Sequence, residues 1–286
     1  MGFWLFLIPH FAFSSAPSPV PVAVASPPAQ TLQYNTHSLE QSLIHTLLIP
    51  SGSRFSVLPA LSQSVEPLAD FAQKYQAVAV LNGGFFDPQN RKSTSYLVLQ
   101  GQIVADPRLN ERLMNSDRLA PYLPKILNRS EFRRYRCEAV IHYDIALHSE
   151  PLPLGCQLVD AIGGGPRLLP ELTSVEEGFT DFANGQMIRD AIGSSQPNAR
   201  TAVGITQDGS VLWVMVAQTP EAPATSGLSL PELANFMKSL GVQKAMNLDG
   251  GSSSSLYYNG QTFYGKVNQQ GEPVQRPVKS VLLLQS

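Results

Sequence analysis

The chain has 286 residues, of which 43% are hydrophobic and 15% are charged, and its formal net charge is -2. This composition supplies enough apolar sequence for a sizeable core. The near-neutral balance excludes a general electrostatic attraction to nucleic acid or to an anionic membrane surface. An anionic ligand would therefore have to be bound by local groups.

The first thirty residues differ in composition from the rest. An apolar run from Phe3 to Phe13 precedes a stretch rich in proline, alanine, valine and serine that reaches Gln30. The run is shorter than the ~20 residues that cross a membrane, so no stable membrane span is predicted. We expect a signal-like segment and linker over 1–30, export to the periplasm or the cell exterior, and a folded domain over 31–286. Because no Lys or Arg precedes Arg54, a disordered apolar tail is the alternative.

The first half of the domain predicts strands and one helix. The ranges 46–49 and 55–58 are expected to be short strands, and apolar residues at helical spacing from Val65 to Ala72 indicate a helix. Residues 77–81 are apolar on both faces, as in a buried central strand, and Asn82 follows them. A hairpin is predicted around Gly101, whereas residues 107–136 are charged and are expected to be helical or irregular.

The second half carries clear turn and capping signals. The Asp208-Gly209 pair predicts a hairpin, and Ser229 with Glu232 has capping-box spacing at the start of a helix. Further strands are expected over 242–248, in a hairpin around Asn259-Gly260, and over 278–284. Strands outnumber helices, so we predict a single α+β domain with a large mixed, mostly antiparallel β-sheet and packed helices.

The chain has two cysteines, Cys137 and Cys156. Their spacing suits one disulfide in an oxidising compartment and fits no zinc site. Two unbonded thiols in the core are the equally simple alternative, since cysteine is among the most buried residue types.

Three glycine-rich segments are candidate ligand sites: Asn82–Phe86, Gly163–Pro166 and Asn247–Ser252. Two of them follow apolar strands, so a sheet would hold their polar side chains while the glycines allow a ligand close to the backbone. Asn247 and Asp249 point to the same side of an extended strand. Tight turns are the alternative for each segment taken alone. No phosphate-binding P-loop is present, because the helix and lysine of that motif are missing.

Arg200 and Thr201 stand just before a predicted strand, where a guanidinium and a hydroxyl could bind phosphate oxygens together. An ordinary surface arginine is the alternative. The five histidines lack metal-ligand spacing, so no metal site is predicted.

In combination, and in this order, these segments resemble the phosphodiester glycosidase family over about residues 75 to 260. The resemblance implies hydrolysis of an N-acetylglucosamine-like sugar from a sugar-1-phosphodiester at the anomeric C–O bond. It implies Asp249 as base or nucleophile, Arg200 with Thr201 as the groups that stabilise the departing phosphate, and Asn82 with Asn247 as sugar ligands. The other expected substrate-binding residues are Gly83, Gly84, Gly164, Gly165, Gly250, Gly251 and Asp87, which is also the first candidate for a second carboxylate.

One departure from the family pattern bears on the pocket. The family has three glycines after the aspartate, whereas Ser252 occupies the third place here. No cofactor is expected, although a divalent cation stays an open possibility, and the oligomeric state is not predicted. Two competing interpretations are a non-catalytic carbohydrate-binding protein of the cell envelope and a phosphodiesterase that cleaves the P–O bond with a cation held by Asp249 and Asn82.

Overall fold

The computed structural model describes residues 1–4, 31–39 and 41–286. The signal-like segment and linker predicted over 1–30 therefore fall almost entirely outside the described residues. Within the described ranges, none of the helices is long and apolar enough to cross a membrane.

Six strands form the first sheet. In spatial order they are β1 (Gln33–Leu39), β2 (Ser42–Ile49), β14 (Val211–Ala217), β13 (Arg200–Thr206), β15 (Val242–Asn247) and β10 (Arg167–Leu169). Helix α4 (Leu230–Ser239) covers one face, where Leu233 and Met237 pack into a buried cluster with Val214. The helix begins with the predicted capping box, in which Ser229 and Glu232 bond each other's backbone N–H groups.

The second sheet faces the first across the main core. Its strands, in spatial order, are β17 (Gln261–Tyr264), β16 (Ser255–Tyr258), β4 (Ala79–Asn82), β18 (Val278–Gln285) and β3 (Ser56–Glu66). Because side chains alternate along a strand, Leu81 joins Trp213 in the core between the sheets, whereas Val80 points to the other face. Helix α1 (Leu68–Tyr75) covers that outer face through Phe71.

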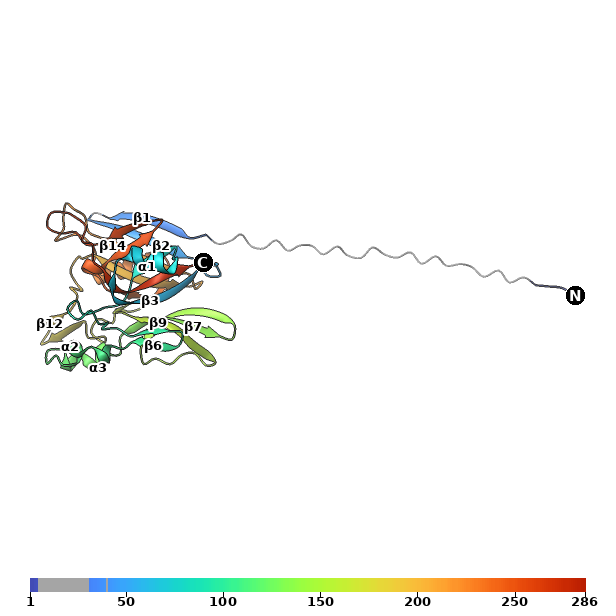
Figure 1. The fold of residues 1–286 in the computed structure, drawn as a ribbon, viewed down its shortest axis with the longest axis horizontal. Helices are drawn as coiled ribbons and strands as arrows, with labels where there is room; N and C mark the ends of the chain where they lie inside the picture. Colours follow the sequence, from blue (N-terminus) through green and yellow to red (C-terminus); the bar gives the residue numbers. More distant parts are fainter. Residues whose placement is uncertain (5–30, 40) are drawn as a thin grey trace.

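A third sheet lies beside these two and is seen in the lower part of Figure 1. Its strands are β6 (Gln102–Ala105), β5 (Leu97–Leu99), β9 (Cys156–Gly163), β7 (Ser130–Cys137) and β8 (Val140–Leu147). The short helices α2 (Glu111–Met114) and α3 (Leu123–Ile126) gather at one end with the hairpin of β11 (Thr180–Ala183) and β12 (Gln186–Asp190). Short 3-10 turns at Pro107–Leu109, Ala120–Tyr122 and Gly251–Ser253 complete the elements.

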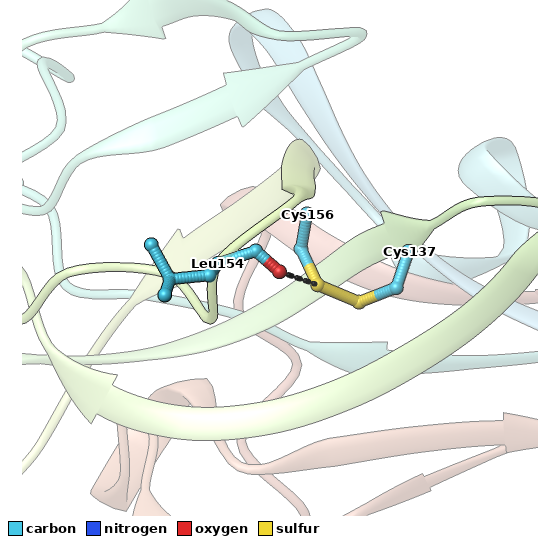
Figure 2. Close-up of a disulfide and its surroundings, with 3 residues drawn as sticks. All are labelled: Cys137, Leu154 and Cys156. Carbon is cyan, nitrogen blue, oxygen red and sulfur yellow. Dashed lines mark hydrogen bonds between the residues drawn. A yellow bond between two sulfur atoms is a disulfide. The ribbon is translucent and has the colours of Figure 1, made fainter.

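A disulfide joins Cys137 at the end of β7 to Cys156 at the start of β9, with their Cα atoms 4.2 Å apart (Figure 2). Of the two alternatives for the cysteines, the disulfide is the one that the structure has. The two residues face each other in the antiparallel register of these strands, so the bond ties neighbouring strands at the end of the third sheet.

The predicted α+β class with mostly antiparallel strands is confirmed. The strands are divided among three larger sheets and one hairpin instead of forming one large sheet, and the strand pairs in the described residues are all antiparallel. The range 107–136, expected to be helical or irregular, also contains most of β7. The sequence does not predict this strand because it contains charged residues that are buried. Arg133 is one of them, and it donates to Glu131 and to three backbone carbonyls.

Candidate active site

The candidate site lies where strands of the first two sheets end together. Asn82 is the last residue of β4, Arg200 is the first of β13, and Asn247 is the last of β15. The antiparallel register places Asn247 beside Ala202, which brings the start of β13 to the end of β15. Asp249 follows β15, and its backbone N–H donates to Gly83 O at 3.0 Å, which joins the ends of the two sheets.

A cavity of about 120 Å³ opens at this junction, and it is lined by Phe85, Ile192, Asn198, Arg200, Asn247, Asp249, Gly250 and Gly251. The cavity therefore brings together five residues that were predicted for the site from the sequence: Arg200, Asn247, Asp249, Gly250 and Gly251. The volume is below the ~300–1,000 Å³ of typical small-molecule pockets. Such a cavity admits part of a sugar and leaves the rest of a larger substrate outside.

Asp249 is the only acidic residue among the described residues that line the cavity. Burial raises the pKa of its carboxyl to about 6, while the Ser253 hydroxyl, the Arg276 guanidinium and the Gly250 backbone act in the opposite direction. A carboxyl with this pKa exchanges a proton near neutral pH. Asp249 can therefore serve as a base when ionised and as an acid when protonated.

Arg200 is 2% exposed, and backbone carbonyls occupy most of its donors. Its Nε donates to Leu228 O, one terminal nitrogen to Ile192 O, and the other to Gly193 O and Gln196 O, at 2.5 to 3.0 Å. A guanidinium has five N–H groups, so little donor capacity is left for a ligand. Burial lowers the pKa of Arg200 to about 10, against the attraction of Asp190. These bonds hold the 192–196 segment of the cavity wall, and phosphate binding by Arg200 stays a prediction.

Asn82 and Thr201 are both fully buried and bonded to each other. Thr201 Oγ1 donates to Asn82 Oδ1 at 2.7 Å, and the Ser255 N–H donates to the same oxygen at 3.0 Å. Asn82 Nδ2 in turn donates to the backbone oxygen of Asp249 at 2.6 Å. These contacts position the backbone that carries Asp249, and direct contacts of Asn82 and Thr201 with a substrate stay a prediction.

Asn247 has one buried atom that the described protein does not satisfy. Its Nδ2 donates to Gly165 O at 3.0 Å and Leu248 O at 2.7 Å, whereas its Oδ1 has no hydrogen-bond partner among the described residues. The side chain is 1% exposed and lines the cavity. A buried acceptor without a partner costs about 1–3 kcal/mol. A ligand hydroxyl or amide in the cavity would remove that cost.

The predicted glycines divide into two groups. Gly250 and Gly251 line the cavity, as expected for residues that admit a ligand. At Gly84 a Cβ atom would lie 2.4 Å from Gly163 O, and at Gly164 it would lie 2.8 Å from Asn247 O. The same close packing holds at Gly83 and Gly165. Gly83, Gly84 and Gly164 let segments of different sheets approach each other, and Gly165 makes room for the Glu177 side chain. None of these four glycines lines the cavity.

Asp87 lies outside the cavity lining. Its carboxylate pairs with Arg112 at 2.8 Å and accepts the Gln89 N–H. Partial burial raises the pKa of Asp87, but the bonds to Gln89 and Arg112 outweigh it and hold the pKa below its usual range. The structure therefore does not bring Asp87 together with Asp249 in the cavity lining, and its role as a second carboxylate stays a prediction.

Sequence reasoning did not select Ile192 and Asn198, which come from the segment after β12. No local motif marks them, because the bonds of Arg200 fold this segment over the cavity. Phe85 belongs to the glycine-rich segment Asn82–Phe86, but no role was predicted for its side chain. Among the described residues, no group of three or more His, Cys, Asp or Glu side chains is placed to hold a metal ion.

Comparison with known proteins identifies the family. The family model for phosphodiester glycosidase matches residues 75–285. The fold is similar to that of the catalytic domain of zebrafish N-acetylglucosamine-1-phosphodiester alpha-N-acetylglucosaminidase, auto-inhibited by its pro-peptide, with a TM-score of 0.64, 19% identity, and coverage of 92% of this chain and 85% of that one. A hypothetical protein from Synechocystis has a TM-score of 0.56 and 16% identity, covering 91% of this chain and 64% of that one.

No curated protein matches the sequence of this chain. The two structural likenesses have low identity and by themselves show the fold alone, whereas the family model covers most of the chain. Its match also includes the ends of β4, β13 and β15, which build the cavity. The chain belongs to the phosphodiester glycosidase family.

Proposed function

We propose that this protein is a hydrolase that releases an N-acetylglucosamine-like sugar from a sugar-1-phosphodiester by breaking the anomeric C–O bond. The observation that carries the proposal is Asp249, a carboxyl with a pKa of about 6 that lines a small cavity in a chain of the phosphodiester glycosidase family. Water supplies the oxygen that joins the anomeric carbon, and the phosphate leaves as a monoester with the bridging oxygen.

The presence of one carboxylate in the cavity lining fits this leaving group. Most glycosidases use a second carboxyl to protonate a poor alkoxide leaving group. A phosphate monoester leaves more easily, because its second pKa is only ~6. Asp249 then acts on the sugar side, as the base that activates water or as the nucleophile.

Neutral groups of the cavity suit a sugar. The unpartnered Oδ1 of Asn247 can accept a bond from a hydroxyl or from an acetamido N–H. Phe85 offers an aromatic surface to the apolar face of a ring, and the backbone at Gly250 and Gly251 lies open to the ligand. In this proposal Asn82, Thr201 and Arg200 position the site, and Asp249 performs the chemistry.

One observation favours a second candidate, a carbohydrate-binding protein without turnover. The described lining holds one carboxylate, and most glycosidases hold two. The metal-assisted phosphodiesterase is less favoured. It needs Oδ1 of Asn82 as a ligand of the cation, and this oxygen already accepts two hydrogen bonds.

The test is sugar release from an N-acetylglucosamine-1-phosphodiester by the purified full-length chain in ¹⁸O-labelled water. We expect turnover with label in the sugar, loss of turnover in Asp249→Asn, and little change in the control Asp87→Asn, whose carboxylate lies outside the cavity lining. Label in the phosphate would establish P–O cleavage instead. Sugar binding without turnover would establish the binding protein.

We further propose that the chain is exported. The pattern of residues 1–30 supports this, and so does the disulfide between Cys137 and Cys156, since such bonds persist in oxidising compartments. Fractionation of the producing cells tests it, and a cytosolic location with reduced cysteines would overturn it.

A further inference from the structure

A second arginine lies next to Asp249 and differs from Arg200 in how its donors are used. Arg276 stands between β17 and β18, and one of its terminal nitrogens donates to Ser252 Oγ at 2.7 Å. Its guanidinium carbon lies 4.9 Å from the ring centroid of Phe86. Within the described residues this guanidinium has one hydrogen-bond acceptor, so most of its N–H groups are open to a ligand.

The other cations near the cavity have partners of their own. Arg200 donates to four backbone carbonyls. Arg129 stacks on Phe179 at 3.6 Å and donates to Glu177 O. Lys266 contacts the amide oxygen of Asn198 at 3.5 Å. Of these residues, only Arg276 is among the groups that act on the Asp249 carboxyl.

Arg276 lies beside the loop that carries Asp249, because its partner Ser252 directly follows Gly251, which lines the cavity. Ile192, in the cavity wall, packs with the cluster beneath α4 on the outer face of the first sheet. Phe86, beneath the guanidinium, packs with the cluster beneath α1 on the outer face of the second sheet. Asp249 lies where the two sheets are joined. The guanidinium held by Ser252 is therefore at the edge of the site that contains this carboxyl.

We propose that Arg276 binds the phosphate of the substrate while the sugar occupies the cavity, so that the anomeric carbon lies at Asp249. This inference rests on the proposed function and gives Arg276 the phosphate-binding role that the sequence had indicated for Arg200. A planar guanidinium pairs with two phosphate oxygens at once, and a cation–π contact with Phe86 helps to hold it in place.

Ser252 is the positioning residue for this arginine. Its hydroxyl accepts the bond that holds the guanidinium at the edge of the site. A glycine in this place, as in the family pattern, has no side-chain oxygen to make that bond. The Ser252 side chain therefore limits the motion of Arg276 and reduces the entropy lost when phosphate binds.

The test compares the binding of N-acetylglucosamine-1-phosphate and of N-acetylglucosamine by calorimetry, using the full-length chain. We expect the wild type to bind the phosphorylated sugar more tightly, and Arg276→Gln to reduce this preference about 10- to 100-fold, as for hydrogen bonds to a charged group. Ser252→Gly should reduce the preference by a smaller factor of about 3 to 10, within the usual value of one such bond. The matched control is Arg112→Gln, which removes an arginine that pairs with Asp87 outside the cavity lining.

The binding readout separates this inference from the proposed function. An unchanged preference in Arg276→Gln, or no preference in the wild type, overturns the role of Arg276 even if the enzyme hydrolyses diesters. A preference that is lost in Arg276→Gln supports the role even if no diester is hydrolysed. Affinity for the unphosphorylated sugar should stay within about twofold in every variant, because a global loss of structure would lower both affinities.

Discussion

The side-chain amide of Asn82 donates to the backbone oxygen of Asp249 at 2.6 Å, although the two residues are 167 positions apart in the chain. Through this bond the last residue of β4 holds the loop that follows β15. The amide oxygen of Asn82 binds Thr201 and Ser255, so one side chain joins four segments of two sheets. The placement of Asp249 consequently depends on contacts distant in sequence.

Asn82→Ala should destabilise the fold and the site together. It removes three buried hydrogen bonds and leaves their partners unsatisfied, so we expect a loss of about 2–4 kcal/mol in the free energy of unfolding, measured with urea. Thr201→Val removes one of these bonds and should cost about 1 kcal/mol. Because the two side chains are bonded to each other, the double variant should lose less than the sum of the single losses. If the loss in the double variant equalled the sum of the two single losses, the shared hydrogen-bond network of Asn82 and Thr201 would be contradicted.

Activity should depend on the ionisation of Asp249. If it acts as base or nucleophile, the reactive form is the carboxylate, and kcat/KM should rise with pH through about 6 and then level off. Initial rates from pH 4 to 8 check this. A rise centred near pH 4, the value of an ordinary aspartate, would contradict the raised pKa of Asp249.

Asp249→Asn should change the pH dependence of stability. The pKa of Asp249 is raised from 3.8 to about 6 in the folded protein, so its contribution to stability is present below pH 3.8 and is lost as the pH rises through 6. Asparagine does not titrate, so the variant should gain stability relative to the wild type between pH 4 and 7. The upper limit of this gain is about 3 kcal/mol. Urea unfolding of both proteins at pH 4 and pH 7 measures this gain. A stability difference between variant and wild type that is the same at the two pH values would contradict the raised pKa.

Arg200→Lys should loosen the wall of the cavity. Lysine keeps the charge but lacks the planar fork, and it cannot reproduce four bonds to Leu228, Ile192, Gly193 and Gln196. We expect a loss of about 2–4 kcal/mol in unfolding free energy and faster amide hydrogen exchange in the 192–196 segment. The control Arg136→Lys changes an exposed arginine on β7 and should leave both measurements unchanged.

Removing the disulfide should lower stability without changing the site. The bond between Cys137 and Cys156 closes a loop with a sequence separation of 19, for which chain entropy predicts about 3 kcal/mol. The Cys137→Ser, Cys156→Ser double variant should therefore unfold at a lower temperature. Its kcat at 25 °C should match the wild type, because neither cysteine lines the cavity. A large fall in kcat while the protein stays folded would show coupling between the third sheet and the site.

Local signals in the sequence were sufficient for much of the fold. The capping box at Ser229 and the Asp208-Gly209 turn act within a few residues, so the start of helix α4 and the hairpin of β13 and β14 were predicted. Strand β7 was missed because its buried charges Glu131 and Arg133 are satisfied by partners elsewhere in the fold. The alternation of apolar and polar residues that marks a strand is absent there.

By itself, the sequence determined the α+β class, the four-motif resemblance and the importance of the Asp249 segment, because these rest on local chemistry and motif order. Only the tertiary structure decided what each side chain does. Arg200 donates to backbone carbonyls of Leu228 and of the 192–196 segment, and Thr201 is buried against Asn82. Arg276 reaches Ser252 from the loop between β17 and β18. Burial and hydrogen-bond partners come from segments far apart in the chain, so no local pattern records them.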